Sequence, residues 1–143
     1  MKEIQGNIWN FHKQGYWIVI TTNGIVKSNG EAVMGRGVAL QAKQKFPTLP
    51  SSLGYYINLN GNVVQHIPGF SIIAFPVKYK WSEKASLELI ESSCQGLVRL
   101  ISIIGVREVY IVRPGCGNGG LDWEDVKPIL EKYLDDRFRV VQL

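Results

Sequence analysis

A glycine-rich turn limits the possible folds and ligands of this chain more than any other segment does. Four glycines fall within the six positions from Gly115 to Gly120, after a largely apolar run and before a helical pattern that starts near Asp122. Glycine allows positive φ angles and lets a ligand approach backbone N–H groups that a side chain would shield. The positive end of the following helix points to the same place. The segment therefore predicts a turn that binds an anion, and phosphate is the expected anion.

A second turn of the same kind occurs earlier in the chain. Residues 30–37 follow the apolar run 17–22 and precede a helical stretch at 38–46. Glycine-rich turns between strands and helices are common, so one alone is weak evidence for phosphate binding. Two such turns after two strands predict one shared site at the carboxyl edge of a sheet.

The length and composition fit a single globular domain. With 143 residues, 45% of them hydrophobic, the chain is long enough to bury a core, and residues 1–143 are expected to form one domain. No apolar run approaches the roughly 20 residues of a membrane span, and the first residues lack the apolar segment of a signal peptide. We expect a cytoplasmic protein with no membrane partner.

Charge and cysteine content add weaker constraints. The net charge of +4 and the pI near 9.1 favour acidic ligands or nucleic acid, but the basic residues are scattered along the chain. Cys94 and Cys116 lack the spacing of metal ligands, and a core of this size does not need a disulfide. We expect both cysteines to be reduced, with Cys94 in the core, and we expect neither a metal nor a cofactor.

Short apolar runs alternate with longer helical patterns, which is typical of α/β proteins. Residues 72–75 and 109–112 include no residue suited to face water, so both strands are expected to be buried on two faces and covered by helices. We therefore predict an α/β fold with three layers (α/β/α), in which a mixed sheet is flanked by helices. The predicted strands are residues 4–11, 16–22, 61–66, 72–77, 108–113 and 137–143, and the predicted helices are residues 38–46, 83–104 and 122–134.

The last predicted helix carries two signals of its own. Asp122 precedes the acidic residues Glu124 and Asp125, a pattern that is typical of an N-cap followed by a first turn that favours the helix dipole. Pro128 lies past the first turn and is expected to kink or restart the helix.

Several established motifs do not match. Gly115, Gly117 and Gly120 have the spacing of a dinucleotide fingerprint, but the remaining tail is too short for the βαβ unit that this fingerprint opens. The earlier turn continues with Arg36 and Gly37, without the Lys and Ser/Thr of a P-loop. The only two histidines stand beside no nucleophile or metal-ligand pattern. The sequence therefore argues against a hydride-transfer enzyme, a nucleotide kinase and a metalloenzyme.

Three segments together resemble the macro domain, a family that binds ADP-ribose. The first segment is Gly6-Asn7-Ile8. The second consists of Asn23 and Asn29 followed by residues 33–39, and the third is the loop 115–121. The resemblance covers essentially the whole chain. Residues 75–81, followed by residues 117–123, further resemble the branch that contains DarG antitoxins and the terminal ADP-ribose protein glycohydrolase.

This resemblance implies roles for particular residues. Lys78 matches the lysine that serves the chemistry in this branch, and Lys80 is its neighbouring competitor. Asn7 is expected near the adenine, Asn23 or Asn29 near the distal ribose, and the two glycine turns around the diphosphate. The expected substrate-binding residues are Asn7, Ile8, Asn23, Asn29, Gly35, Arg36, Gly37, Val38, Pro114, Gly115, Cys116, Gly117, Asn118, Gly119, Gly120 and Leu121.

The chain departs from the branch at two places. The terminal protein glycohydrolase has an aspartate within its second glycine loop, where this chain has Asn118, Gly119 and Gly120, as DarG-like sequences do. A mechanism that needs this carboxylate is not transferred, and Glu31 is only a speculative substitute. Residues 24–28 in the first loop resemble an insertion relative to DarG and leave the exact substrate open.

The expected function is therefore hydrolysis of an ADP-ribosyl bond, with Lys78 attacking or electrostatically supporting the distal C1″ carbon. The partner is ADP-ribose or an ADP-ribosylated macromolecule, and the leaving group is a base in ADP-ribosylated DNA, a carboxylate of a protein or a 1″-phosphate. A non-catalytic ADP-ribose reader is the alternative. A nucleic-acid-binding protein, suggested by the pI and by Trp9, Tyr16 and Trp81, is a further one.

Overall fold

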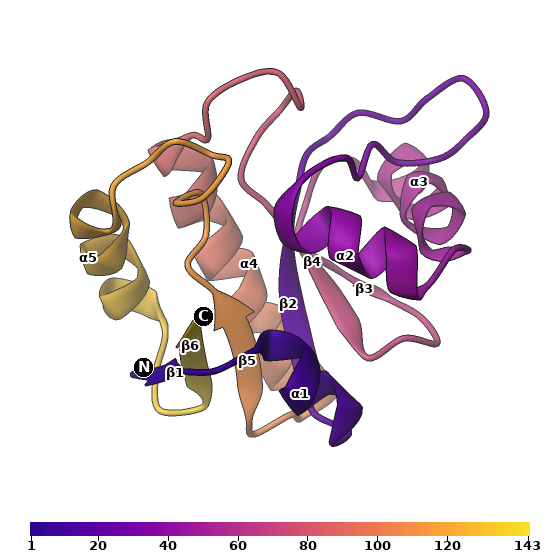
Figure 1. The fold of residues 1–143 in the computed structure, drawn as a ribbon. Coiled ribbons are helices and arrows are strands. Elements are labelled where there is room, and N and C mark those ends of the chain that lie inside the picture. The colour runs from indigo at the N-terminus through magenta and orange to yellow at the C-terminus, as the bar shows by residue number, and fades with distance from the viewer.

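The computed structural model describes residues 1–143, which form one six-stranded sheet and five helices (Figure 1). The strands follow one another across the sheet in the order β1-β6-β5-β2-β4-β3. All neighbouring pairs are parallel except β3 and β4, so the sheet is mixed. The strands are β1 (Lys2–Gln5), β2 (Trp17–Thr22), β3 (Gln65–Ile67), β4 (Ile72–Pro76), β5 (Val109–Val112) and β6 (Phe138–Gln142).

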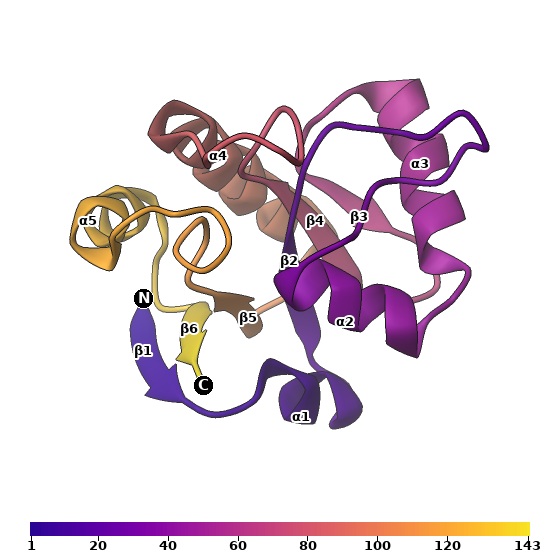
Figure 2. The ribbon, with the colours of Figure 1, turned by 45° about the horizontal axis from the view of Figure 1, so that its top comes forward.

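Helices cover both faces of the sheet, which confirms the predicted three-layer α/β/α fold class (Figure 2). One face packs against α1 (Ile8–Lys13), α2 (Gly37–Lys45) and α3 (Leu49–Asn60). The opposite face packs against α4 (Leu87–Ile104) and α5 (Trp123–Tyr133). Each face has its own cluster of 16 buried residues, so β4, between the two clusters, is buried along its whole length as predicted.

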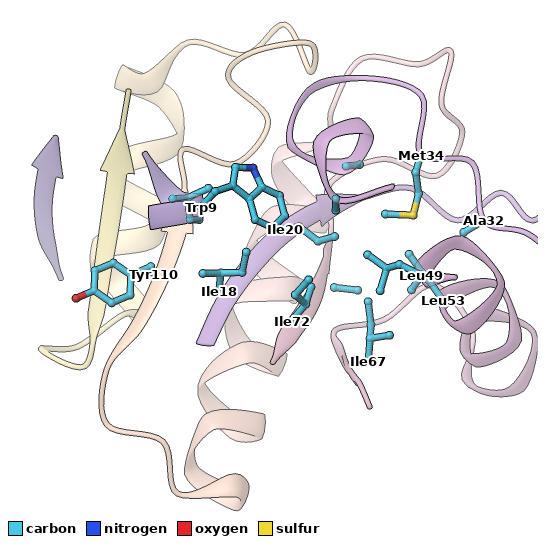
Figure 3. Packing of buried hydrophobic residues seen from close by; sticks show 14 of the residues in the cluster. Trp9, Ile18, Ile20, Ala32, Met34, Leu49, Leu53, Ile67, Ile72 and Tyr110 are labelled. Atoms are coloured by element: carbon cyan, nitrogen blue, oxygen red, sulfur yellow. The ribbon is translucent and has the colours of Figure 1, made fainter. Parts of the chain in front are cut away.

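The core on the first face is built from alternate residues of the strands. Ile18 and Ile20 of β2 point to this face and meet the side chains of α1 and α3 (Figure 3). Val19, between them in the sequence, belongs to the cluster on the other face. This alternation follows from the two-residue period of a strand, and it explains why the central strands lack polar residues.

Helix α4 shows how local sequence sets the bounds of an element. Its N-cap Ser86 accepts a hydrogen bond from the N–H of Leu89, and the helix ends at Gly105 in the left-handed conformation. Ile90, Cys94, Leu97 and Ile101 follow one another at spacings of three and four and are fully buried, whereas Leu87 at the start of the helix is exposed. The expected core position of Cys94 is confirmed, and neither cysteine forms a disulfide.

The first predicted strand was wrong over its second half. Residues 8–11 belong to α1 instead of a strand, because Asn7 caps a helix by accepting a hydrogen bond from the N–H of Trp9. Helix α3 was not predicted, although Leu49, Leu53 and Ile57 follow a spacing of four and are all buried. Strand β3 begins later than predicted and continues to Ile67.

Pro128 does not end or restart α5. The helix runs from Trp123 to Tyr133 through the proline, so the expected restart is wrong. Val126 and Leu130, on either side of Pro128, are fully buried against the sheet, and this packing offsets the loss of one backbone hydrogen bond. Asp122 occupies the N-cap position as predicted, but its side chain accepts no capping hydrogen bond.

None of the helices combines the length and the apolar character that crossing a lipid bilayer requires.

Gly54 provides a test of how α3 packs against the first glycine turn. A Cβ atom at Gly54 would lie 1.9 Å from the carbonyl oxygen of Gly30, so Gly54→Ala forces the helix away from the first glycine turn. We expect a loss of about 1–3 kcal/mol in the free energy of unfolding, as for overpacking. Chemical denaturation measures it.

The matched control is Gly96→Ala in α4, where the new Cβ atom makes only an ordinary contact of 3.4 Å with Val64. Alanine favours a helix over glycine, so this variant is expected to be at least as stable as the parent. Equal stability of the Gly54 and Gly96 variants would contradict the close packing of α3.

Candidate functional site

A cavity of about 820 Å³ lies at the carboxyl ends of the central parallel strands. Thr21 and Thr22 at the end of β2, Val77 after β4 and Val112 at the end of β5 all line it. The loops that follow these three strands rise at the same edge of the sheet (Figure 1). Ligand sites of α/β proteins commonly occupy this position.

All charged side chains that line the cavity are positive. They are Arg36, Lys78 and Arg113, and no Asp, Glu or His side chain is among the lining residues. Arg113 is already paired with Glu3, whereas Arg36 and Lys78 form no ion pair. The cavity therefore suits an anion and offers no side-chain carboxylate for acid–base chemistry.

The two glycine turns meet in this cavity, as the sequence predicted. Gly35, Arg36, Gly37 and Val38 line one side, and residues 115–119 line the other. The turns approach closely, since a Cβ atom at Gly37 would lie 3.1 Å from Nδ2 of Asn118. Gly37 also has a positive φ of 58°, so glycine is required at this position for both reasons.

Backbone N–H groups of both turns are available to a ligand. Helix α2 begins without a side-chain cap, and the N–H groups of Gly37 and Val38 donate to no acceptor in the chain. The same is true of the three N–H groups from Gly117 to Gly119. Unpaired donors at a helix start and in a glycine turn are suited to phosphate oxygens.

The second turn is held in shape by its own backbone. The N–H of Leu121 donates to the carbonyl of Gly115, and the N–H of Gly120 donates to that of Gly117. A Cβ atom at Gly119 would lie only 2.4 Å from the carbonyl oxygen of Gly115. The turn therefore excludes larger residues at Gly119.

Lys78 follows β4 and connects two of the loops around the cavity. Its Nζ donates to the carbonyl oxygen of Asn118 at 3.3 Å and to that of Trp81 at 3.4 Å. Burial of the ammonium group lowers the pKa of Lys78, and the positive charge of Arg36 lowers it further. Cys116 lines the same cavity, but burial raises the pKa of its thiol and keeps it protonated. The surroundings therefore favour loss of a proton from Lys78 and disfavour it from Cys116.

The backbone around Lys78 is fixed by neighbouring segments. Nδ2 of Asn62 donates to the carbonyl of Lys78 at 3.1 Å, and the N–H of Gly24 donates to the carbonyl of Tyr79 at 3.2 Å. Asn62 Oδ1 is buried without a hydrogen-bond partner. These contacts fix the start of the loop that carries Lys78.

Comparison of the sequence with known proteins finds relatives of this chain. No family model matches the chain. A DNA ADP-ribosyl glycohydrolase of Mycobacterium tuberculosis is 33% identical over 109 residues, which are 69% of this chain and 31% of the relative. The protein of the same name from Thermus aquaticus is 32% identical over 119 residues, 75% of this chain and 32% of the relative. The chain thus spans about a third of the length of these relatives.

Solved structures match over nearly the whole chain. The macrodomain of Thermus aquaticus DarG has a TM-score of 0.76 and 27% identity, and the match covers 99% of this chain and 97% of that one. The macrodomain of Mycobacterium tuberculosis DarG has a TM-score of 0.77, 24% identity and the same coverage. This chain is a macrodomain. The resemblance to DarG macrodomains that the sequence suggested is confirmed.

Asn7 and Asn23, two of the predicted site residues, also form hydrogen bonds within the macrodomain. Oδ1 of Asn7 accepts the N–H of Trp9. Asn23 donates to the carbonyl of Val33 and accepts the N–H of Ile25, so it holds the first loop in shape. Both residues line the cavity, as does Ile8.

Four predicted site residues lie outside the cavity lining, and their contact with a ligand stays a prediction. Asn29 bonds to Glu31 in an exposed part of the first loop. Pro114, Gly120 and Leu121 flank the second glycine turn without lining the cavity. Of the pair Asn23 and Asn29, the structure brings only Asn23 to the cavity.

Lys80, the competitor of Lys78, and Glu31, the substitute for the missing loop carboxylate, also lie elsewhere. Glu31 pairs with Lys27, and neither Glu31 nor Lys80 lines the cavity. The structure therefore brings Lys78, and not its competitor, beside the glycine turns.

Other lining residues were not predicted from the sequence. The ends of β2 and β5 would have indicated some of them, because carboxyl ends of parallel strands meet at one edge. Gln41, one turn into α2, and Trp81 gave no such signal. The unpredicted lining residues are Gly6, Thr21, Thr22, Val33, Ala39, Gln41, Val77, Trp81, Val112, Arg113, Val141, Gln142 and Leu143.

The charge of Arg36 provides a test of the electrostatics of the macrodomain. Arg36→Gln removes a repulsion between two positive charges, so the pKa of Lys78 should rise toward the 10.5 of an ordinary lysine. It should remain below that value, because the burial of the amine is unchanged. An NMR titration of the lysine side-chain carbons measures the shift. Arg99→Gln, on the exposed side of α4, is the control, and a Lys78 pKa that responds equally to both variants would contradict this assignment.

Proposed function

We propose that this macrodomain binds ADP-ribose and hydrolyses the bond that links ADP-ribose to DNA. The observation that carries the proposal is the composition of the cavity: every charged lining side chain is positive, and one of them is a lysine with a lowered pKa. Residues 1–143 share one sheet, which supports their assignment to one domain, and we place its action in the cytoplasm.

The diphosphate of ADP-ribose binds between the two glycine turns. The free N–H groups at the start of α2 and in the second turn donate to its oxygens, and Arg36 adds a positive charge. Asn7 and Ile8, at the start of α1, contact the adenine. Asn23 contacts the distal ribose, which brings the C1″ carbon toward Lys78.

Lys78 performs the chemistry at C1″. As a neutral amine, its nitrogen lone pair attacks C1″ while the bond to the leaving group breaks, and water then releases ADP-ribose from the lysine. As an ammonium ion, it would instead stabilise negative charge on the leaving group. The lowered pKa favours the first role, because it increases the fraction of neutral amine near neutral pH.

DNA is the proposed carrier of the ADP-ribosyl group for two reasons. The curated relatives are named DNA ADP-ribosyl glycohydrolases, and the cavity has Asn118 where the protein glycohydrolase has an aspartate. The fold is also shared by Thermosipho africanus DarTG in complex with ADP-ribose, with a TM-score of 0.74 and 20% identity over 99% of this chain and 41% of that one.

Gly117→Glu tests the binding half of the proposal. No atom lies within 4 Å of a Cβ at Gly117, so the fold accommodates a side chain there. The carboxylate would repel the diphosphate, and affinity for ADP-ribose should fall at least about tenfold, which is 1.4 kcal/mol. Calorimetry of ADP-ribose binding measures it. Gly117→Ala should change affinity far less, and full affinity of the Glu variant would place the site elsewhere.

Lys78→Ala tests the catalytic half. Turnover should fall at least roughly a hundredfold, as expected when a covalent or acid–base group is lost, while affinity for ADP-ribose changes little. The assay incubates ADP-ribosylated DNA, ADP-ribosylated protein and ADP-ribose 1″-phosphate in parallel and measures the released product. Lys43→Ala, on the exposed side of α2, is the control.

The pH profile of the parent separates the two roles of Lys78. For a neutral nucleophile, kcat/KM rises with pH until the amine is deprotonated; for an ammonium ion it falls above the same pKa. Undiminished turnover by Lys78→Ala on all three substrates would exclude the lysine mechanism. Binding of ADP-ribose by a parent that cleaves none of them would favour the non-catalytic reader.

A further inference from the structure

The loop that carries Lys78 also presents aromatic side chains to solvent. We call residues 78–84 the rim loop, since it joins β4 to α4 beside the cavity (Figure 1). Tyr79 is 57% exposed and Trp81 is 50% exposed. By contrast, Trp9 is 8% exposed and belongs to the core, and Tyr16 packs against Tyr110. The exposed aromatic groups near the cavity are thus concentrated in this one loop.

The rings of the rim loop make no aromatic or cation–π contact within the chain. Tyr79 and Trp81 are absent from all aromatic pairs and cation–π contacts of the structure. Burial of an aromatic ring is favourable, so two exposed rings two positions apart in one loop indicate a surface that is covered by a ligand.

The rim loop is also basic. Lys78, Lys80 and Lys84 belong to it, against the single acidic residue Glu83. None of these lysines forms an ion pair. Lys80 and Lys84 therefore have charges that a phosphate group can neutralise without breaking an existing contact.

The rim loop is held in place by backbone hydrogen bonds at both ends. The N–H of Gly24 donates to the carbonyl of Tyr79, and the N–H of Ala85 donates to the carbonyl of Gly119. Within the loop, the N–H of Glu83 donates to the carbonyl of Lys80. A loop fixed in this way loses little conformational freedom on binding, which favours affinity.

Trp81 connects the exposed surface to the cavity. Its residue lines the cavity and its carbonyl accepts a hydrogen bond from Lys78, while half of its side-chain surface faces solvent. Among the aromatic residues of the rim loop, Trp81 therefore both lines the cavity and is open to solvent.

We propose that the rim loop binds the single-stranded DNA on either side of the modified nucleotide. Bases stack on Trp81 and Tyr79, and Lys80 and Lys84 contact the backbone phosphates. Unpaired bases have free faces for stacking on aromatic rings, whereas bases in a duplex are stacked on one another. The inference rests on the proposed function, because it takes the ADP-ribosylated nucleotide to be part of DNA.

Direct binding of an unmodified oligothymidylate of about ten nucleotides tests the rim loop without any ADP-ribose chemistry. Fluorescence anisotropy at low ionic strength should detect binding by the parent. Tyr79→Ala should weaken it about fivefold or more, as expected for loss of one stacked base. Lys80→Ala should weaken it and reduce the slope of log affinity against log salt by about 0.7, as for one phosphate of a single strand.

Matched controls use exposed residues outside the rim loop. Tyr55→Ala removes a ring that is 61% exposed on α3, and Lys43→Ala removes a charge from α2; neither should alter oligonucleotide binding. Tyr79→Ala and Lys80→Ala should also retain the parent's affinity for free ADP-ribose by calorimetry, and their kcat/KM should fall on an ADP-ribosylated oligonucleotide but not on ADP-ribosylated thymidine.

The experiments distinguish a failure of the rim-loop inference from a failure of the proposed function. If the parent binds ADP-ribose but no oligonucleotide, or if Tyr79→Ala and Lys80→Ala bind the oligonucleotide as well as the parent, the rim-loop inference is overturned and the ADP-ribose site stands. Equal or higher affinity for a duplex of the same length would also overturn it. If the parent binds no ADP-ribose, the proposed function itself fails.

Discussion

The parallel pairing of β2 with both β4 and β5 determines where everything else in this macrodomain lies. Residues 18–22 of β2 align with residues 72–76 of β4, and residues 17–19 align with residues 109–111 of β5. Because all three strands run in one direction, the loops after them leave the sheet at one edge. The first glycine turn, the loop of Lys78 and the second glycine turn are therefore neighbours, although some 80 residues separate the first from the last.

The cavity at this edge offers an anion few charged groups. Free backbone N–H groups of the two glycine turns also face it, and the positive φ of Gly37 favours glycine at the point where the first turn approaches Asn118. The lining includes no Asp, Glu or His side chain, and the proposed chemistry therefore relies on Lys78. The same lysine bonds to the carbonyl of Asn118, so the proposed reacting group and the second glycine turn are in direct contact.

Sequence reasoning succeeded where the physics is local. The apolar runs 72–75 and 109–112 indicated buried strands, and the glycine turns after two strands indicated one shared cavity at the sheet edge, because these features depend on a few adjacent residues. It failed where distant packing decides: residues 8–11 form a helix capped by Asn7, and α5 continues through Pro128 because its neighbours are buried. Sequence reasoning likewise could not decide which of Asn23 and Asn29 lines the cavity, because this depends on the path of the first loop in the folded chain.

Arg36 connects the two halves of the proposed function. In the free macrodomain its charge lowers the pKa of Lys78 and adds to the effect of burial. A diphosphate bound beside Arg36 would compensate that charge, and this effect by itself would raise the pKa of Lys78. By linkage, the diphosphate binds more tightly to the protonated form than to the neutral one. Burial of the amine by the bound ribose acts in the opposite direction, since it disfavours the ammonium ion. The two effects together determine how much neutral amine faces C1″ once the substrate is in place, and the position of the distal ribose therefore matters as much to the chemistry as the lysine itself.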